Sequence, residues 1–149
     1  MATLLEKLPL PAERAAVIAD CNKLLDAEVA RKKGMTGLAI KAGYKILKSF
    51  KPGAVPDAID NLLDDFIAAL EPFHSDYLAA EDCASFGTHL RGRQDEVAEA
   101  LVQVTDGRAD RSRHTTLVRG YRKLRPGALR HVGQAVPGLA DLFDRYYQG

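Results

Sequence analysis

The chain reads PDAIDNLLDDFIAALE from Pro56 to Glu71, and this stretch decides the fold class. Its apolar residues recur three and four positions apart, at Ile59, Leu62, Leu63, Phe66, Ile67 and Leu70. This spacing places them on one face of an α-helix, and the proline and aspartate at its start suit a first helical turn. The stretch therefore predicts an amphipathic helix over residues 56–71, ended by Pro72.

Helical periodicity also dominates the rest of the chain. We expect further helices over residues 11–33, 36–50, 75–90, from 95 onward, 111–124, 128–136 and 137–147. No segment alternates apolar and polar residues for long, and β-branched residues are sparse, so strands are not predicted. The predicted fold is all-α, a compact bundle of seven to nine helices that forms a single domain over residues 1–149.

The composition agrees with a globular domain of this kind. The 149 residues are 46% hydrophobic and 28% charged, which permits a sizeable core and excludes collagen, low-complexity disorder and a disulfide-dense scaffold. The periodic positions predict that the following residues share a core: Val17, Ile18, Leu24, Leu25, Ile46, Leu47, Ile59, Leu63, Phe66, Leu101 and Tyr121.

The sequence contains a weak internal echo. Gly43-Tyr44-Lys45 is followed by Lys51-Pro52-Gly53-Ala54, and Gly120-Tyr121-Arg122 is followed by Arg125-Pro126-Gly127-Ala128. Two interpretations stay open: a degenerate duplication of a three-helix unit, or independent use of the same turn chemistry between helices.

Charge is strongly segregated although the formal net charge is only +1. The stretches 31–51 and 108–130 are basic, whereas residues 53–85 carry eight acids and no lysine or arginine. The candidate contacts for an anion or a partner are Lys41, Lys45, Lys48, Arg119, Arg122 and Arg125. Alternatively, the acids of residues 57–82 neutralise these cations within the fold, through exposed pairs that contribute little each.

Glycine and alanine gather at Gly37, Ala39, Ala42 and Gly43 within the predicted helix 36–50. Two glycines inside a helix cost about 1 kcal/mol each relative to alanine, so a close contact must offset them. We expect close packing of another helix against these small residues, or a groove for a ligand or partner helix.

No motif for catalysis, metal binding or phosphate binding is present. The Glu71-Pro72-Phe73-His74 segment has the letters of an ExxH pair, but Pro72 argues that Glu71 and His74 do not share a helical face. The two cysteines, Cys21 and Cys83, lack metal-type spacing and are expected to be reduced structural thiols. We therefore predict no cofactor and no metal, and lean against an enzyme.

The chain resembles an uncharacterised family of small helical bacterial proteins, mostly actinobacterial, classed as a domain of unknown function. The residues that carry the resemblance are 31–45, the Lys51-Pro52-Gly53 turn, 66–73 and 95–101. The resemblance implies a helical bacterial protein and implies no catalytic residue.

The sequence favours a non-enzymatic interaction module that binds a protein partner or associates with itself through helix faces. A polyanion binder, for nucleic acid or an anionic lipid surface, is the alternative, with nucleic-acid binding expected to be weak or absent. A carrier of a small apolar ligand, or an enzyme without recognisable motifs, is the third class. We expect a cytoplasmic location, because no signal peptide and no apolar run of membrane-spanning length is visible.

Overall fold

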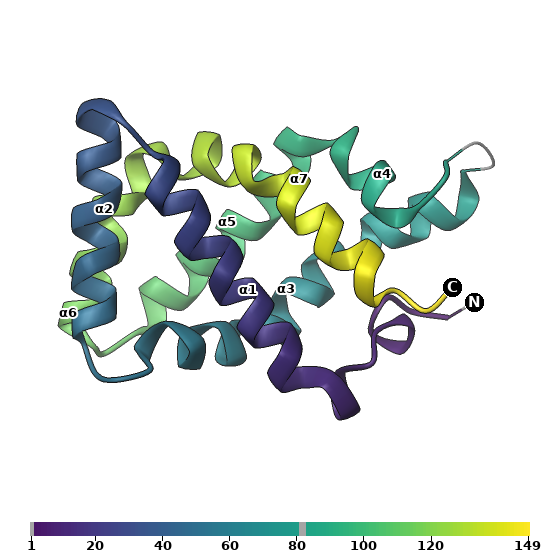
Figure 1. Cartoon of the computed structure of the whole chain (residues 1–149), viewed down its shortest axis with the longest axis horizontal. Helices are drawn as coiled ribbons and strands as arrows, with labels where there is room; N and C mark the ends of the chain where they lie inside the picture. The colour runs from purple at the N-terminus through teal and green to yellow at the C-terminus, as the bar shows by residue number, and fades with distance from the viewer. Residues whose placement is uncertain (1, 81–82) are drawn as a thin grey trace.

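The computed structural model describes residues 2–80 and 83–149, which fold as helices joined by short connections (Figure 1). The described α-helices are α1 (Leu10–Arg31), α2 (Gly34–Ser49), α3 (Ala54–Ala79), α4 (Phe86–Arg91), α5 (Gln94–Arg111), α6 (Thr115–Leu124) and α7 (Ala128–Tyr146). Two 3₁₀-helices, η1 (Leu5–Lys7) and η2 (Arg125–Gly127), complete the set. The described residues contain no strand, so the all-α prediction is confirmed.

The helices are fewer and longer than predicted. In the described residues six helices have ten residues or more and α4 has only six residues, so six long helices stand against the expected seven to nine. The expected breaks at Pro72 and Pro137 do not occur, because both prolines lie inside helices, α3 and α7. Each proline lacks the backbone donor of a helical hydrogen bond, but a buried neighbour, Phe73 after Pro72 and Val136 before Pro137, holds the helix in place by packing.

The turn between α2 and α3 forms as its glycine suggests. Gly53 has φ 74°, a left-handed conformation that glycine adopts without steric cost, and α3 begins at the next residue. The C-terminal part of α3 was predicted as a separate helix over residues 75–90. The structure instead continues α3 to Ala79 and starts α4 at Phe86, where the Ser85 side chain accepts a hydrogen bond from the Thr88 amide.

The main core lies between the N-terminal segment and helices α3, α4, α5 and α7. Its buried residues are Leu4, Leu8, Leu10, Leu63, Ile67, Leu70, Phe73, Phe86, Leu90, Val97, Val136, Ala140 and Phe143. Of the predicted core residues, Leu63 is buried in this cluster, and Val17, Ile18 and Leu101 pack against it. The remaining predictions are half-buried except Leu25, which is 37% exposed and is therefore wrong.

The two ends of the chain meet at one end of the molecule, opposite the end formed by α2 and α6 (Figure 1). The Gln148 amide donates to the Lys7 carbonyl at 2.8 Å, and the Leu4 amide donates to the Glu71 carboxylate at 2.7 Å. Next to these bonds, the fully buried His74 ring shares a hydrogen bond of 2.8 Å with the Tyr147 hydroxyl. Three parts of the chain are thereby joined around α3.

Helices α2 and α6 cross at two glycines. A side chain at Gly43 would lie 2.9 Å from the Gly120 carbonyl oxygen and from Leu124 Cγ. Reciprocally, a side chain at Gly120 would lie 3.0 Å from Leu47 Cδ2 and 3.2 Å from the Gly43 carbonyl oxygen. The crossing is therefore built from matching positions of the sequence echo, each helix placing a leucine against the glycine of the other.

A second pair of contacts follows the same pattern. The Tyr44 hydroxyl on α2 donates to Asp26 on α1, and the Tyr121 hydroxyl on α6 donates to Asp106 on α5. In both halves, a tyrosine next to the crossing glycine is anchored to an aspartate on the preceding helix. Each bond thus ties one helix of the crossing to the helix that precedes it in the chain.

Candidate functional site

The surface formed by α2 and α6, hereafter the basic end, collects cations without acids. Neither helix contains aspartate or glutamate. Its exposed cations are Lys41, Lys45 and Lys48 on α2 and Arg119, Arg122 and Lys123 on α6. Among the described residues, these six side chains form no ion pair, so their charges face solvent.

Five of the acids in residues 53–85, hereafter the acidic segment, pair with cations outside this set. Its ion pairs are Asp57–Lys51 at 3.0 Å, Asp60–Arg14 at 2.7 Å, Asp64–Arg14 at 3.2 Å, Asp65–Arg108 at 2.8 Å and Asp76–Arg93 at 2.7 Å. Glu81 and Asp82 lie outside the described residues. Neutralisation of the basic stretches by residues 57–76 therefore reaches Lys51 and Arg108 and, within the described structure, none of the six cations of the basic end.

Arg125 differs from the other predicted contacts because it is held internally. Its Nε donates to Asp106 at 2.9 Å, and the same carboxylate accepts the Tyr121 hydroxyl at 2.5 Å. The hydrogen bond from Tyr121, together with the Arg125 charge, lowers the pKa of Asp106, and burial raises the pKa of Tyr121 to about 12. Arg125 therefore holds η2 against α5. Lys123, which was not among the predicted contacts, is an exposed cation of the basic end.

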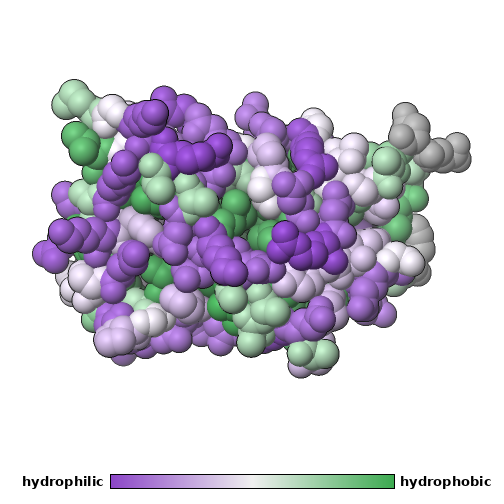
Figure 2. Space-filling model, viewed as in Figure 1, coloured by the Kyte–Doolittle hydropathy of each residue, from purple (hydrophilic) through white to green (hydrophobic). Residues whose placement is uncertain are grey.

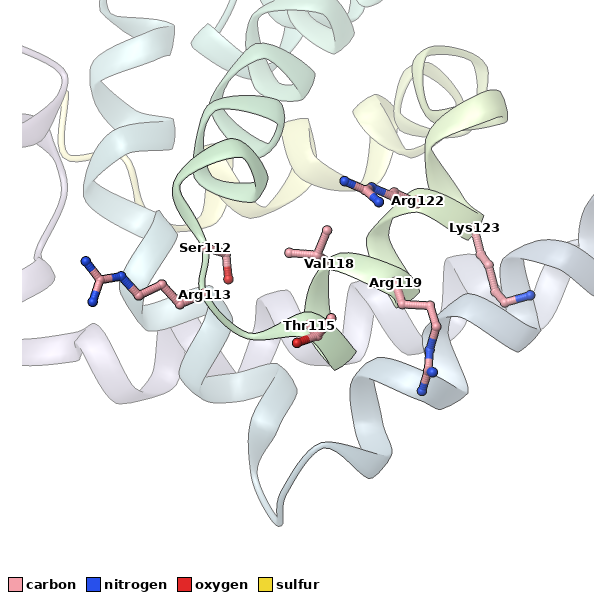
Figure 3. A pocket seen from close by; sticks show the side chains of 7 residues that line it. All are labelled: Ser112, Arg113, Thr115, Val118, Arg119, Arg122 and Lys123. Atoms are coloured by element: carbon pink, nitrogen blue, oxygen red, sulfur yellow. The ribbon is translucent and has the colours of Figure 1, made fainter.

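The α6 side of the basic end is a hollow of about 590 Å³ lined by Ser112, Arg113, Thr115, Val118, Arg119, Arg122 and Lys123. Figure 3 shows Arg119 and Lys123 along one side of α6 and Arg122 on the other side, above Val118. Four cations and two hydroxyl groups around one hollow form a donor set suited to phosphate or carboxylate groups.

A second hollow, of about 700 Å³, lies between α1 and α2 and includes all three α2 lysines. Tyr44 also lines this hollow. Burial raises the pKa of the Tyr44 phenol, as does its hydrogen bond to Asp26. The Lys48 ammonium lies 5.3 Å from the centroid of the Tyr44 ring. Lys45 here and Arg122 in the first hollow are matching positions of the echo. The basic end thus carries two hollows, one on each side of the Gly43–Gly120 crossing.

The small residues predicted on α2 divide between packing and exposure. A side chain at Gly37 would lie 2.7 Å from the Lys32 backbone, so Gly37 packs against the preceding turn, and Gly43 packs against α6. Ala39 and Ala42 face solvent instead. They are accompanied by Met35 and Leu38, which are 88% and 69% exposed.

Met35 lies three and four residues before Leu38 and Ala39, and Ala42 lies four and three residues after them. These four residues therefore form one stripe on α2, hereafter the apolar ridge. Figure 2 shows hydrophobic residues projecting at the end where α2 begins (upper left), beside hydrophilic ones. Sequence reasoning missed Met35 and Leu38 because an apolar residue on an amphipathic helix is normally assigned to the core. Their position on the side of the helix away from Gly37 and Gly43 is the signal that marks them as exposed.

The structure also shows the surroundings of the Glu71–His74 pair and of the two cysteines. Contrary to the prediction from Pro72, Glu71 and His74 do face each other on continuous α3, with Oε1 3.6 Å from Nδ1. Glu71 also holds the Leu4 amide, and His74 bonds Tyr147, so the pair stabilises the meeting of the chain ends. Cys21 and Cys83 are both free thiols, and burial raises the pKa of Cys21 to about 11, which keeps it a weak nucleophile.

Within the described residues, no group of three or more His, Cys, Asp or Glu side chains gathers in a metal-binding arrangement. No helix in the same part of the chain combines the length and apolarity needed to cross a bilayer.

Comparison with known proteins identifies a family but no individual relative. No curated protein and no solved structure matches the chain. A family model matches residues 4–147, almost the whole sequence, and its description assigns no function. The resemblance expected from residues 31–45, 66–73 and 95–101 is thereby confirmed: the chain belongs to the family of unknown function DUF6918.

Proposed function

We propose that this protein is an interaction module that binds an anionic partner through the basic end. The observation that carries the proposal is the distribution of ion pairs: five acids of the acidic segment pair with Arg14, Lys51, Arg93 and Arg108, which lie outside the six cations of the basic end. The cations of α2 and α6 keep their charge for a partner, and together with two hollows they supply many donors within one surface.

Duplication of a three-helix unit supports the same proposal, and we infer it from the reciprocal leucine–glycine contacts and the two tyrosine–aspartate bonds. Two copies packed around the Gly43–Gly120 crossing place their equivalent cations, Lys45 and Arg122, at the same end of the molecule. An extended polyanion is the ligand that contacts both copies at once.

Heparin chromatography tests this function. We expect the protein to be retained at low salt and eluted by moderate salt, since each neutralised anionic group releases counterions. The double variant Lys45→Glu/Arg122→Glu should elute without retention. The matched control Lys7→Glu/Lys23→Glu makes the same change of net charge outside the basic end, at lysines that form no ion pair with the residues the structure describes, and should elute close to the wild type. Equal loss of retention in both variants would contradict a localised site.

Self-association is the second candidate, and the apolar ridge is the observation that favours it. Light scattering at increasing protein concentration tests it, with Leu38→Glu as the variant that should keep the protein monomeric. A cytoplasmic location also belongs to this proposal, because the two free thiols fit a reducing compartment.

A further inference from the structure

The apolar ridge lies between two rows of cations. The α2 lysines line the hollow on the α1 side of the helix, at positions that flank the ridge at three- and four-residue steps. On the other side α2 contacts α6 through Gly43, and Arg119 and Lys123 lie on the side of α6 beside this contact (Figure 3). From its α1 side to its α6 side, the basic end therefore presents first lysines, then aliphatic side chains, and then arginine and lysine.

We propose that the anionic partner is a lipid bilayer surface, on which α2 lies with the apolar ridge among the headgroups. The inference rests on the proposed function, since the same cations bind the anionic lipids. An interfacial helix combines an apolar stripe that enters the headgroup region with lysines that extend back to the phosphates.

The character of the ridge favours a bilayer over a nucleic acid. Single-stranded nucleic acids are bound by exposed aromatic rings, but Tyr44 is buried and Tyr121 is half-buried with its hydroxyl bonded to Asp106. Duplex phosphates give no favourable contact to Met35 and Leu38, the most exposed large apolar side chains described. Hydrophobic residues project from the molecular outline where α2 begins (Figure 2), and a projecting apolar surface meets a flat surface more readily than it encloses a small ligand.

The expected affinity is modest and strongly dependent on charge. Each lysine or arginine brought to an anionic bilayer strengthens binding roughly fivefold, and the effect falls off within a Debye length. Removing two charges is therefore expected to weaken binding roughly 25-fold. Removal of the ridge should weaken it further at constant charge, because the aliphatic side chains contribute through burial in the interface.

Tryptophan fluorescence tests the insertion directly, because the chain contains no tryptophan. Met35→Trp places the only tryptophan on the ridge, and Ala68→Trp places it at an exposed site on α3 between Asp64 and Glu71. Vesicles of phosphatidylcholine with phosphatidylserine should shift the Met35→Trp emission to the blue and leave Ala68→Trp unchanged. Vesicles of phosphatidylcholine alone should shift neither.

Vesicle co-sedimentation separates the contributions of charge and ridge. Lys41→Glu/Lys45→Glu should lose binding to the anionic vesicles, whereas Lys7→Glu/Lys23→Glu should keep it. Met35→Ser/Leu38→Ser should bind them at least fivefold more weakly while its retention on heparin stays that of the wild type. Leu5→Ser, an exposed leucine at the opposite end, is the matched control and should bind normally. Unchanged circular dichroism shows that all these surface variants remain folded.

The outcomes distinguish this inference from the proposed function. Retention on heparin or a shift of duplex DNA mobility without vesicle binding overturns the bilayer and leaves the anionic partner. Vesicle binding that is insensitive to the ridge substitutions also overturns the inserted ridge. A dimer that Leu38→Glu dissociates, without vesicle binding, assigns the ridge to a second copy instead. Absence of binding to heparin, DNA and anionic vesicles overturns both proposals.

Discussion

Gly43 and Gly120 are the residues on which the approach of α2 and α6 depends. At each position a methyl group would meet the opposite backbone and a leucine at 3.2 Å or less, whereas real side chains keep a larger separation. The two glycines are therefore required by contact, since neither has a left-handed backbone. The sequence predicted a close contact at Gly43, but its partner could not be identified from spacing alone.

Gly43→Ala should destabilise the protein by roughly 1–3 kcal/mol, because the added methyl forces two helices apart. Gly107→Ala is the control: this glycine lies inside α5, and its nearest neighbour would be the flexible Arg111 side chain at 3.5 Å. Removing a helical glycine there should stabilise by about 0.5–1 kcal/mol. Urea unfolding followed by circular dichroism measures both, and a Gly43→Ala variant as stable as the wild type would contradict the crossing.

The Tyr147 hydroxyl provides a hydrogen-bond partner for the His74 ring, which has no access to water. Tyr147→Phe removes the hydroxyl bonded to the fully buried His74 and should cost about 1–3 kcal/mol in unfolding free energy. Tyr146→Phe removes a hydroxyl that donates to Asp20 at 2.5 Å in a more exposed place, so its cost should be smaller. Thermal unfolding of the two variants side by side measures the difference, and equal losses would argue against a special role of the buried ring.

At the scale of the helices, periodicity predicts most of the fold and proline misleads at two places. The prediction over 11–33 differs from α1 by one or two residues at each end, and that over 36–50 from α2 in the same way. Pro72 and Pro137 were expected to end helices because local chemistry disfavours them. The helices continue through both prolines because buried neighbours such as Phe73 pack in the core, and this burial is not visible in the local sequence.

The candidate site was predictable in part for the same reason. Charge runs identified Lys41, Lys45, Lys48, Arg119 and Arg122 as candidates, since the absence of acids from their helices is visible in the sequence. The separation of Arg125 from this group depends on Asp106, which reaches it only when α5 and α6 pack. The exposure of Met35 and Leu38 depends likewise on which face of α2 meets α6.

Charge reversal should divide the arginines of α6 and η2 into two kinds. Arg125→Glu places a second carboxylate against that of Asp106 and removes a hydrogen-bonded ion pair. We therefore expect the free energy of unfolding to fall by roughly 1–2 kcal/mol, after allowance for the partial exposure of the pair. Arg119→Glu/Arg122→Glu should change stability by no more than about 0.5 kcal/mol, since neither residue has an ion-pair partner in the described structure. Thermal unfolding in the absence of ligand measures both, and a large loss in the double variant would reveal a hidden partner.

At the scale of the whole molecule, stability should respond to mild acid through two histidines. Burial lowers the pKa of His89 and, together with the nearby Lys32 and Arg130 charges, that of His131. One ring nitrogen of each is buried without a hydrogen-bond partner in the described structure. In mild acid the unfolded chain therefore binds protons that the folded chain does not, so the free energy of unfolding rises as the pH is raised through the region where these histidines titrate.

Between about pH 5 and pH 7.5, the urea midpoint should increase with pH. His89→Gln/His131→Gln should flatten this dependence. The carboxylates with lowered pKa, such as Asp106, titrate in more acidic solution and add their loss below this window. A slope that survives the double variant would assign the proton uptake to other groups.

The bond between the Gln148 amide and the Lys7 carbonyl gives the backbone the topology of a nearly closed ring. A few added residues could join the two ends covalently, and the ring could then be reopened between α5 and α6, near Arg113. Such a circular permutant keeps every helix and every helix contact, while it moves both chain ends from one pole of the molecule to the other. In the original connectivity, a surface anchor or a fluorescent label at either end instead leaves α2 and α6, the helices that carry the cations, at the opposite end of the molecule from the attachment (Figure 1).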